Sequence, residues 1–429
     1  MENKIIDGYY PRIADDILDE KLKEAGAVFI KGPKWCGKST TALRKAGSAV
    51  FLQDLTTREQ NILRAKNDPT NFLAGETPRL IDEWQDISFI WDQVRFLVDQ
   101  RKKRGQFILT GSATPVDENS YSHSGIGRIV PMIMRPLSLF ESMEGKGEIS
   151  LDVLFHHPEK FQSATCDLKL EDYAYLTCRG GWPEVLQDEK ERALNHARNF
   201  YNGLVEEDIN KVTKNKKNPK RVRNILRSYS RGIAGEMSLK NMKDDIFENE
   251  GEKIDEDTIS VYLSALRKLY VIEDLPAWNT NLRSKTAIRT SDTHHFVDPS
   301  IACAALDVWP NDLLNDLNTF GLFFESLCIR DLRIYSEKLH GNVSHYRDKR
   351  GREADAIIHL WTGEWAAVEI KLSSSDSIEE GVQHLIALKK DIDTTKEKAP
   401  SFLMVVTTTP FAYRREDGVY VVPLGCLKD

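Results

Sequence analysis

A glycine-spaced segment near the N-terminus constrains the fold more than any other part of the sequence. It reads Gly32-Pro33-Lys34-Trp35-Cys36-Gly37-Lys38-Ser39 and fits GxxxxGK[ST] at every fixed position. An apolar run, 27–31, precedes the segment, and residues 38–46 have the pattern of a helix. Glycines allow backbone N–H groups to converge on an anion, and the following helix directs its positive end to that anion. The sequence therefore predicts a strand, a phosphate-binding loop and a helix; the alternative is a chance glycine turn.

Phosphate chemistry gives three side chains of this loop specific roles. We expect the ammonium of Lys38 to reach the β- and γ-phosphates of a nucleotide and the hydroxyl of Ser39 to hold Mg²⁺. Thr40 supplies the neighbouring hydroxyl, which we expect near the α-phosphate. The predicted ligands are therefore ATP and Mg²⁺.

Two adjacent acids end a later apolar strand, in the segment Arg79-Leu80-Ile81-Asp82-Glu83. An Asp at the C-terminal end of such a strand can bind Mg²⁺ through water, and a Glu beside it can orient or deprotonate an attacking water. We therefore expect Asp82 to be a metal ligand and Glu83 to be the catalytic carboxylate of an ATP hydrolase, which orients or deprotonates the water. The alternative is a pair of solvated acids that opens the next helix.

Hydroxyl groups end the following apolar strand, and an arginine follows two glycines further on. Thr110 or Ser112 is expected to sense the γ-phosphate or to position the water, unless the segment is an ordinary turn. Arg128 is expected to stabilise charge on the transferring phosphoryl group, in its own chain or in a neighbouring copy. The alternative for Arg128 is a surface cation at the start of a strand.

Strands and helices alternate through the first third of the chain. This order predicts an α/β domain with a parallel sheet and helices on both faces, as in P-loop NTPases. The pattern changes near residues 145 and 290, so we expect three domains, at 1–145, 146–290 and 291–429.

Composition narrows the class of protein. The 429 residues are 41% hydrophobic and 29% charged, which is typical of soluble globular proteins. Residues 1–11 carry charges and no apolar run, and no stretch is long enough to span a bilayer. None of the six cysteines forms a CxxC pair, which argues against a zinc ribbon. We therefore expect a cytoplasmic protein with reduced thiols and no membrane partner.

The middle segment carries a block of positive charge in a chain whose net charge is -7. Residues 211–231 hold nine Lys or Arg residues and no acid, so they are a candidate contact for the phosphate backbone of DNA or RNA. The alternative is a solvated helix face with a basic linker. Helices expected at 238–246 and 258–269, followed by a strand at 271–275, have the order of a winged helix.

Acidic residues and a lysine recur at intervals in the last third of the chain. Asp355 and the segment Glu369-Ile370-Lys371 lie on two predicted strands, and Glu369 and Lys371 share one strand face. Paired carboxylates can hold Mg²⁺ at a scissile phosphate, and a lysine beside them can orient the water. Glu325 and Gln383, on the flanking helices, are expected to complete this nuclease-like site. The alternative is a solvated strand with a cross-strand ion pair.

Nearly the full length of the chain resembles a prokaryotic family of P-loop ATPases. These proteins join an AAA-type ATPase domain to a C-terminal domain of unknown function with a restriction-endonuclease-like core. The segments that carry the resemblance are Tyr10-Pro11-Arg12, Gly32–Thr40, Leu80–Gln85, Leu109–Ser112, Gly127-Arg128-Ile129, Arg135-Pro136-Leu137-Ser138, Gly180–Glu184, Thr258–Leu275, Phe324-Glu325, Arg352–Asp355 and Val368–Lys371. One departure is Lys34-Trp35-Cys36, where the family more often has Arg-Gln-Val; these positions are not constrained by the motif.

The resemblance implies binding of ATP and Mg²⁺, and hydrolysis. It transfers the Walker A role to Lys38 and Ser39 and the Walker B role to Asp82 and Glu83. It also transfers a nuclease-like acidic site to Glu325, Asp355, Glu369 and Lys371.

Two functional hypotheses follow. In the first, an ATPase couples its nucleotide state to a nucleic-acid-directed, nuclease-like C-terminal domain. In the second, the chain is a signalling or scaffold ATPase whose C-terminal domain is a non-cutting interaction module. A small-molecule kinase fits poorly, because the Asp82-Glu83 pair favours water as the nucleophile. A homo-oligomer is compatible with either hypothesis.

Overall fold

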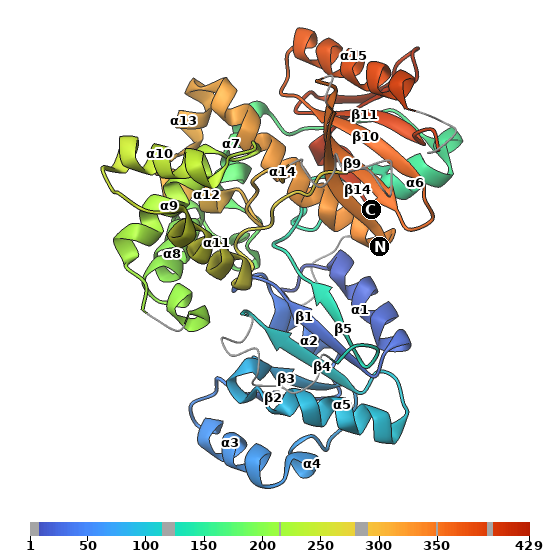
Figure 1. Cartoon of the computed structure of the whole chain (residues 1–429). Coiled ribbons are helices and arrows are strands. Elements are labelled where there is room, and N and C mark those ends of the chain that lie inside the picture. Colours follow the sequence, from blue (N-terminus) through green and yellow to red (C-terminus); the bar gives the residue numbers. More distant parts are fainter. Residues whose placement is uncertain (1–7, 114–124, 214–215, 279–290, 349–350, 393–397) are drawn as a thin grey trace.

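The computed structural model describes residues 8–113, 125–213, 216–278, 291–348, 351–392 and 398–429. Figure 1 shows an N-terminal sheet with its helices, a group of helices beside it, and a second sheet formed by the C-terminal part of the chain. No helix in these described ranges combines the length and the apolar character needed to cross a membrane. All six cysteines are buried and free.

The N-terminal sheet is parallel and has the strand order β2-β3-β4-β1-β5. Its strands are β1 (Ala27–Lys31), β2 (Ser48–Phe51), β3 (Arg79–Asp82), β4 (Phe107–Gly111) and β5 (Ile129–Ile133). Strand β4 is inserted between β1 and β3, so the phosphate-loop strand and the strand with the acids are not direct neighbours. The expected parallel sheet of a P-loop NTPase is confirmed.

Helices cover both faces of this sheet. Val28, Ile30 and Ile108 pack with α1 (Ile13–Glu24) and α2 (Lys38–Lys45) on one face. Ala27, Ile81 and Leu109 point to the other face, where they pack with α3 (Arg58–Asn67), α4 (Pro69–Phe72) and α5 (Ile90–Arg101). Successive strand residues alternate between the faces, and both faces are apolar because both are buried.

The middle of the chain is helical. Its helices are α7 (Leu170–Arg179), α8 (Lys190–Glu206), α9 (Pro219–Arg231), α10 (Leu239–Glu250), α11 (Glu256–Lys268), α12 (Ser300–Leu306) and α13 (Pro310–Asn315). Residues 271–275 do not form the regular strand expected from sequence. They make isolated antiparallel bridges instead, Ile272 with Phe296 and Leu275 with Thr293.

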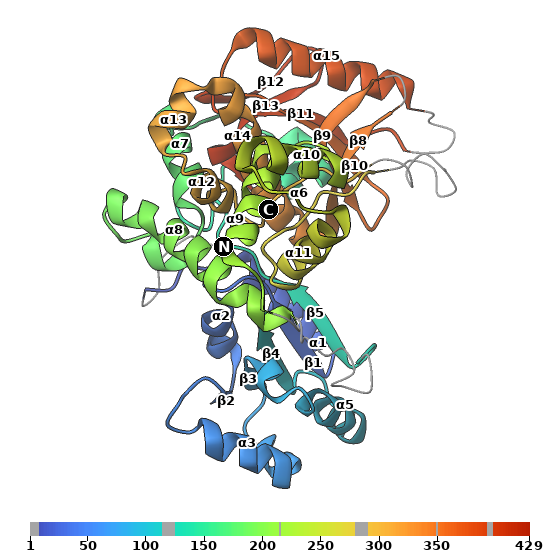
Figure 2. The ribbon, with the colours of Figure 1, turned by 60° about the vertical axis from the view of Figure 1, so that its left-hand side comes forward.

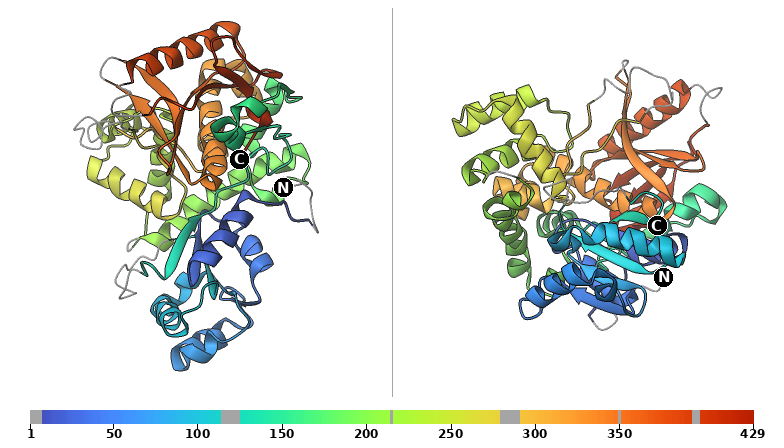
Figure 3. Two further views of the ribbon diagram at one scale, coloured as in Figure 1. Left: turned by 90° about the vertical axis from the view of Figure 1, so that its right-hand side faces the viewer. Right: turned by 60° about the horizontal axis from the view of Figure 1, so that its bottom comes forward.

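The C-terminal sheet has seven strands in the order β7-β12-β13-β11-β10-β9-β8. They are β7 (Ala164–Thr165), β8 (Gly341–Arg347), β9 (Glu353–Leu360), β10 (Trp365–Ile370), β11 (Phe402–Thr407), β12 (Phe411–Arg414) and β13 (Tyr420–Pro423). Helices α14 (Leu317–Lys338) and α15 (Ser375–Asp391) pack on opposite faces (Figure 3). Strands β8 to β10 are antiparallel, and β11 returns parallel to β10 after α15.

Two segments pack against a part of the chain other than the predicted domain in which they lie. β7 pairs with β12 at the edge of the seven-stranded sheet, and β6 (Ile149–Ser150) forms a separate two-stranded sheet with β14 (Leu427–Lys428). Residues 149–165, with α6 (Leu151–His156), therefore pack with the C-terminal part of the chain. Helices α12 and α13 lie beyond residue 290, but they pack against α7, α8 and α9. Short edge strands and small helices carry too weak a pattern to reveal these partners.

The segment 134–145 connects all three parts of the molecule. Leu137 N–H donates to the Gly181 carbonyl at 2.6 Å, and Leu139 N–H donates to Asp331 at 2.9 Å. The Arg135 guanidinium bonds Glu273 at 2.8 Å and Glu337 at 2.9 Å. These contacts join the segment to the middle part of the chain and to α14. A displacement of the segment would therefore change its contacts with both.

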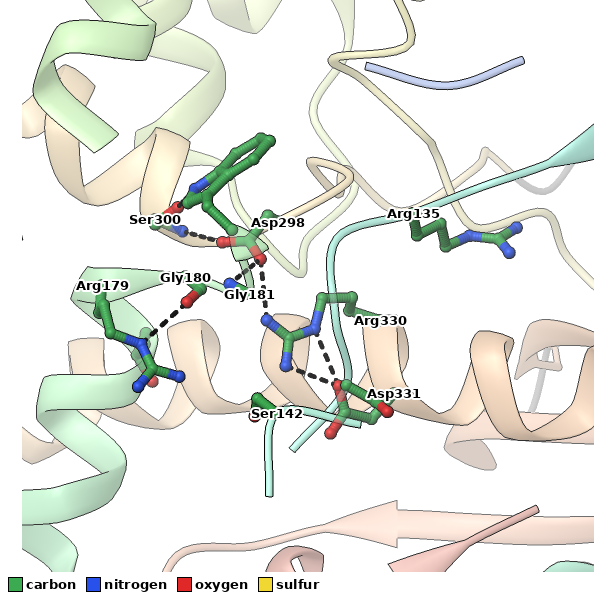
Figure 4. Close-up of polar contacts among 12 residues, drawn as sticks. Arg135, Ser142, Arg179, Gly180, Gly181, Asp298, Ser300, Arg330 and Asp331 are labelled. Atoms are coloured by element: carbon green, nitrogen blue, oxygen red, sulfur yellow. Dashed lines mark hydrogen bonds and ion pairs between the residues drawn. The ribbon is translucent and has the colours of Figure 1, made fainter. Parts of the chain in front are cut away.

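Arg330, Asp298 and Asp331 form a buried charged cluster next to this segment (Figure 4). Arg330 lies 2.8 Å from Asp298 and 2.7 Å from Asp331, and the three side chains are at most 1% exposed. Asp298 also accepts from the Gly181 N–H at 3.0 Å. The cluster therefore ties α14 to the turn at 180–184 and to residues 137–139.

Candidate functional site: the phosphate-loop cavity

The loop conformation explains the two glycines of the motif. Gly37 has φ 95°, in the left-handed region that glycine adopts without strain. A Cβ at Gly32 would lie 2.1 Å from the carbonyl oxygen of Met134, so no side chain fits there. The loop therefore packs directly against the start of the 134–145 segment.

Hydroxyl and carboxylate groups meet where the sequence predicts the metal. The Ser39 hydroxyl donates to Asp82 Oδ1 at 2.6 Å, and the Thr110 hydroxyl donates to the same oxygen at 2.6 Å. The Lys38 ammonium is buried and donates to the Pro33 carbonyl at 2.7 Å, inside the loop. The structure thus brings Ser39, at the start of α2, to Asp82, at the end of β3, although β1, which leads into the loop and α2, does not pair with β3.

Thr110 contacts both acids that end β3. Its hydroxyl donates to Asp82 and accepts from the Glu83 N–H at 3.1 Å. These two contacts orient the acids. A role of Thr110 or Ser112 in sensing the γ-phosphate or positioning the water stays a prediction.

Glu83 is held in place by a strained backbone and by two side chains. Its φ of 54° and ψ of 51° lie in the left-handed region, which a non-glycine residue adopts at a cost of about 1–3 kcal/mol. Its carboxylate accepts from the Ser112 hydroxyl at 2.9 Å and from the Gln85 amide. Of these, Ser112 was a sequence candidate, whereas Gln85 appears there only as part of the Leu80–Gln85 segment.

A cavity of about 530 Å³ opens over the loop. The segment before α1, the phosphate loop with the start of α2, and the turn after α7 form most of its lining, and Gln53, Glu83 and Leu137 complete it. Its wall includes Tyr9, Tyr10, Lys38, Ser39, Glu83, Pro183 and Glu184. Cavities of about 300–1,000 Å³ hold small ligands, so the volume suits a nucleotide. The sequence marked Tyr10-Pro11-Arg12 and Gly180–Glu184 only as segments of the resemblance, without a role, because local pattern does not show that they meet.

The middle helices brace the phosphate loop directly. Lys34 lies 2.5 Å from Asp208, and the Trp35 ring packs on His196 at 4.6 Å and on Phe200 at 5.7 Å between centroids. His196 and Phe200 both belong to α8, so this helix packs on the phosphate loop that precedes α2 (Figure 2). The loop positions that the motif leaves unconstrained are therefore used for contacts between domains.

Arg12 joins the loop to the connecting segment. This buried guanidinium donates to the Cys36 carbonyl at 3.0 Å, to the Arg135 carbonyl at 2.8 Å and to Glu141 at 3.2 Å. Burial acts to lower the pKa of Arg12, but the nearby Glu141, Tyr9 and Cys36 together outweigh burial, so the pKa of Arg12 is raised. One charged side chain therefore contacts the backbone of both the loop and residue 135.

Arg128 lies at the opposite edge of the sheet from the phosphate loop. It precedes β5, and β5 runs parallel to β1, so Arg128 lies beside the start of β1 while the loop follows its end. A five-residue strand separates the two edges by roughly 16 Å. Its guanidinium pairs with Asp99 at 2.8 Å. The expectation that Arg128 acts on the phosphoryl group of its own chain is therefore wrong.

The C-terminal acids converge as predicted, around a lysine. Lys371 lies 2.8 Å from Glu369 and 3.9 Å from Asp355, and Asp355 accepts from the Ile370 N–H at 2.7 Å. Glu369 is 1% exposed. Burial and the nearby Asp355 raise the pKa of Glu369 to about 8, and the same two causes raise the pKa of Glu325. These four residues therefore form one electrostatic cluster.

Gln383 does not join this cluster. It is exposed and donates to Glu379 at 2.7 Å, one turn away on α15. The next residue, His384, lies 3.7 Å from Glu369 and was missed. A shift of one residue turns a helical side chain by about 100°, more than a sequence reading of helix phase resolves. Across the described ranges, no group of three or more His, Cys, Asp and Glu residues is arranged to hold a metal ion.

Most arginines of the basic block 211–231 are paired within the molecule. Arg221 pairs with Glu252 at 2.7 Å, Arg223 with Glu206 at 2.7 Å, and Arg231 with Asp245 at 2.8 Å. The acids that pair with Arg221 and Arg231 are only 18% exposed, so these two arginines offer less charge to a nucleic-acid backbone than the sequence suggests.

Comparison with protein families assigns the N-terminal part. Residues 24–143 match the family described as "AAA domain". Residues 170–312 match "Domain of unknown function (DUF8612)", and residues 320–427 match "Domain of unknown function (DUF4143)". A search of curated proteins found no match.

Two solved structures are similar over large parts of the chain. The Walker-type ATPase PABY2304 of Pyrococcus abyssi is 15% identical, with a TM-score of 0.41 over 71% of this chain and 98% of that one. A STAND (Signal Transduction ATPase with Numerous Domains) protein with a tetratricopeptide repeat sensor, PH0952 from Pyrococcus horikoshii, is 12% identical, with a TM-score of 0.21 over 78% and 48%.

The site geometry and the family match agree on the first third of the chain. The loop, the shared contact of Ser39 and Thr110 with Asp82, and the sheet order all lie within the matched residues. Residues 24–143 thus match an AAA domain and have the parallel sheet and phosphate loop of a P-loop NTPase.

Proposed function

We propose that the chain is a Mg²⁺-dependent ATPase whose middle helices sense the nucleotide and whose connecting segment transmits its state to the C-terminal domain. The observation that carries the proposal is the composition of the cavity wall. Pro183 and Glu184 of the middle part face the same space as Lys38 and Ser39. A nucleotide in this cavity would contact both parts, so its binding and release would change how they are held together.

The residues at the loop fit a magnesium ion. Ser39 and Asp82 supply a hydroxyl and a carboxylate oxygen 2.6 Å apart, and oxygen is the ligand atom that Mg²⁺ prefers. The ion, when bound, neutralises charge on the nucleotide phosphates. Lys38 then holds the terminal phosphates, and Glu83 orients the attacking water or accepts its proton.

The route from the nucleotide to the C-terminal domain runs through three contacts. Arg12 touches the loop and residue 135, Arg135 pairs with Glu337 of α14, and Leu139 bonds Asp331 of the same helix. Helix α14 packs on the C-terminal sheet. This chain of contacts supports coupling between nucleotide state and the C-terminal domain.

Replacing Lys38 by alanine is expected to weaken Mg²⁺–ATP binding by about 10- to 100-fold, because charged hydrogen bonds to the phosphates are lost. Isothermal titration calorimetry of the full chain measures this change. Lys45→Ala is the matched control, because Lys45 lies on the same helix and pairs with Asp19 at 2.6 Å. If the lysine variants bind Mg²⁺–ATP equally well, the cavity does not hold the nucleotide phosphates.

For the C-terminal domain, two proposals compete: cleavage of nucleic acid, and a non-cutting interaction module. The contacts of Lys371 favour the second. Lys371 already neutralises Glu369, and Glu369 is too buried to meet a polymer without rearrangement. We therefore propose an effector module that responds to the ATPase. An effect of Arg128 on ATP bound to a neighbouring copy, and binding of DNA or RNA by residues 211–231, stay predictions.

The non-cutting proposal makes a direct prediction. Wild type and Asp355→Ala are expected to show the same background in Mg²⁺-dependent cleavage assays on DNA and RNA, with and without ATP. Both are expected to hydrolyse ATP at the same rate, because Asp355 is remote from the phosphate loop in the fold. Cleavage by wild type that Asp355→Ala abolishes would establish the nuclease proposal instead.

A further inference from the structure

A second cavity, of about 490 Å³, lies between helices α8, α9 and α12. Its charged lining consists of Arg198, Lys220, Arg223, Arg227, Glu250 and Asp307. Four cations and two acids leave a surplus of two positive charges in a chain whose net charge is -7. The ATPase cavity does not include any of these residues.

Two of the four cations that line this cavity are paired with exposed acids. Arg223 pairs with Glu206 and Arg198 pairs with Asp307, and the two acids are 52% and 74% exposed. Ion pairs with such exposed acids contribute little, so the guanidinium groups can turn to another anion at small cost. Arg227 lies 3.2 Å from the better buried Glu250. The ammonium of Lys220 has no ion-pair partner in the part of the chain that the structure describes.

The chemistry of the lining selects phosphate. Arginine presents planar N–H donors that match phosphate oxygens two at a time, and lysine adds a point charge. Asn202 and Asn224 add uncharged polar groups to the same wall, and Ala304 and Ala305 add an apolar surface. The volume of this concave site is in the range of small-ligand pockets, and its mostly polar and charged lining suits a charged ligand.

The acids at the rim of the cavity favour a small ligand over a polymer. Glu206, Glu250 and Asp307 lie beside the cations, so a long phosphate backbone that left the cavity would pass over negative charge. A compact phosphorylated molecule would remain within the cationic part.

Helix α8 places this cavity next to the ATPase loop. His196 and Phe200, four residues apart, pack on Trp35 of the phosphate loop. Arg198 and Asn202, also four residues apart, line the second cavity from another face of the same helix. One rigid helix therefore separates the two sites.

We propose that this cavity binds a small molecule carrying a phosphate or diphosphate group. The site is distinct from the ATPase cavity, and its existence does not depend on ATP hydrolysis. Its position on α8 makes the ligand an effector of the middle helices that brace the phosphate loop.

The test is a calorimetric titration of the full chain with inorganic diphosphate at physiological ionic strength. The parent for all comparisons carries Lys38→Ala, which weakens diphosphate binding at the phosphate loop. In this background, Lys220→Gln with Arg223→Gln is expected to weaken binding by about tenfold or more, because two charged contacts are lost. Arg221→Gln is the matched control, because Arg221 lies on α9 outside the cavity and pairs with Glu252. Its affinity for diphosphate is expected to equal that of the parent.

Lys220→Gln alone is the second variant, since it removes an exposed, unpaired cation and leaves the helix contacts intact. It is expected to weaken diphosphate binding about threefold. Equal affinity of the cavity variants and of Arg221→Gln would overturn the proposal. Tighter binding of a short oligonucleotide than of diphosphate, lost in the same cavity variants, would also overturn it, because the ligand would then be a polymer.

Discussion

Glu83→Gln is expected to reduce the rate of ATP hydrolysis by about 10²- to 10³-fold and to leave the affinity for Mg²⁺–ATP within about twofold. A general base or water-orienting carboxylate contributes to the reaction and not to ground-state binding of the phosphates. Lys38 and Ser39, which we propose to contact the nucleotide, are unchanged in this variant. The two measured quantities should therefore separate.

The contacts around Glu83 allow this substitution to change the chemistry of the side chain without changing the fold. Glutamine has the same shape, and its carbonyl oxygen can still accept from the Ser112 hydroxyl, which lies 2.9 Å from the carboxylate. The left-handed backbone at residue 83 belongs to the turn between β3 and the 3₁₀ helix Trp84–Ile87, so the substitution does not alter it. The fold should be retained, and a loss of rate then reports on chemistry.

Phosphate release at saturating ATP, together with calorimetric titration, measures the two effects. Asp86→Asn is the matched control, because Asp86 lies three residues on and pairs with Arg58 at 3.4 Å outside the cavity. It is expected to hydrolyse ATP at nearly the wild-type rate. Equal rates for wild type and Glu83→Gln would remove Glu83 from the reaction and point to another base.

The phosphate loop was predictable because its signal is local. The roles of Gly32 and Gly37 depend on backbone geometry within one turn, and Ser39 meets Asp82 because the C-terminal ends of parallel strands share one edge. Arg128 could not be placed in the same way. The distance of Arg128 from the loop depends on which end of β5 it lies at. To know which edge of the sheet this end belongs to, one needs the direction and order of the strands.

Contacts between distant segments account for the rest of what the sequence did not reveal. The packing of Trp35 on α8 joins positions about 160 residues apart, and the pairing of β6 with β14 joins the ends of a still longer stretch. Neither contact has a periodic pattern. In the C-terminal cluster, strand alternation predicted Glu369 and Lys371 on one face, whereas helix phase misplaced Gln383 relative to His384.

Arg330→Met is expected to lower the free energy of unfolding by about 3–5 kcal/mol, the largest stability effect predicted for this chain. Asp298 and Asp331 would lose their shared cation while remaining buried. Burial already raises the pKa of Asp331, and Arg330 opposes that rise. Without the guanidinium, each carboxylate must take up a proton or stay charged away from water, and both outcomes destabilise the fold.

The loss of stability should extend beyond α14, because Asp298 and Asp331 also accept hydrogen bonds from backbone N–H groups. Asp298 accepts from Gly181 beside the nucleotide cavity, and Asp331 accepts from Leu139 of the connecting segment. We therefore expect Arg330→Met to weaken Mg²⁺–ATP binding as well, although Arg330 does not line the cavity. A variant that unfolds at the wild-type denaturant midpoint would show that the cluster contributes no net stability.

Two further variants separate the loss of the charge cluster from a general effect of losing an arginine. Arg347→Gln removes an exposed guanidinium that lies 3.6 Å from Glu236, and its unfolding free energy should change by less than about 0.5 kcal/mol. Adding Asp298→Asn and Asp331→Asn to Arg330→Met removes the unpaired negative charges, so urea unfolding should recover part of the lost stability. Recovery is expected because the penalty comes mainly from buried carboxylates left without a cation. If the triple variant is as unstable as Arg330→Met, packing of the arginine stem, and not its charge, holds α14 against the connecting segment.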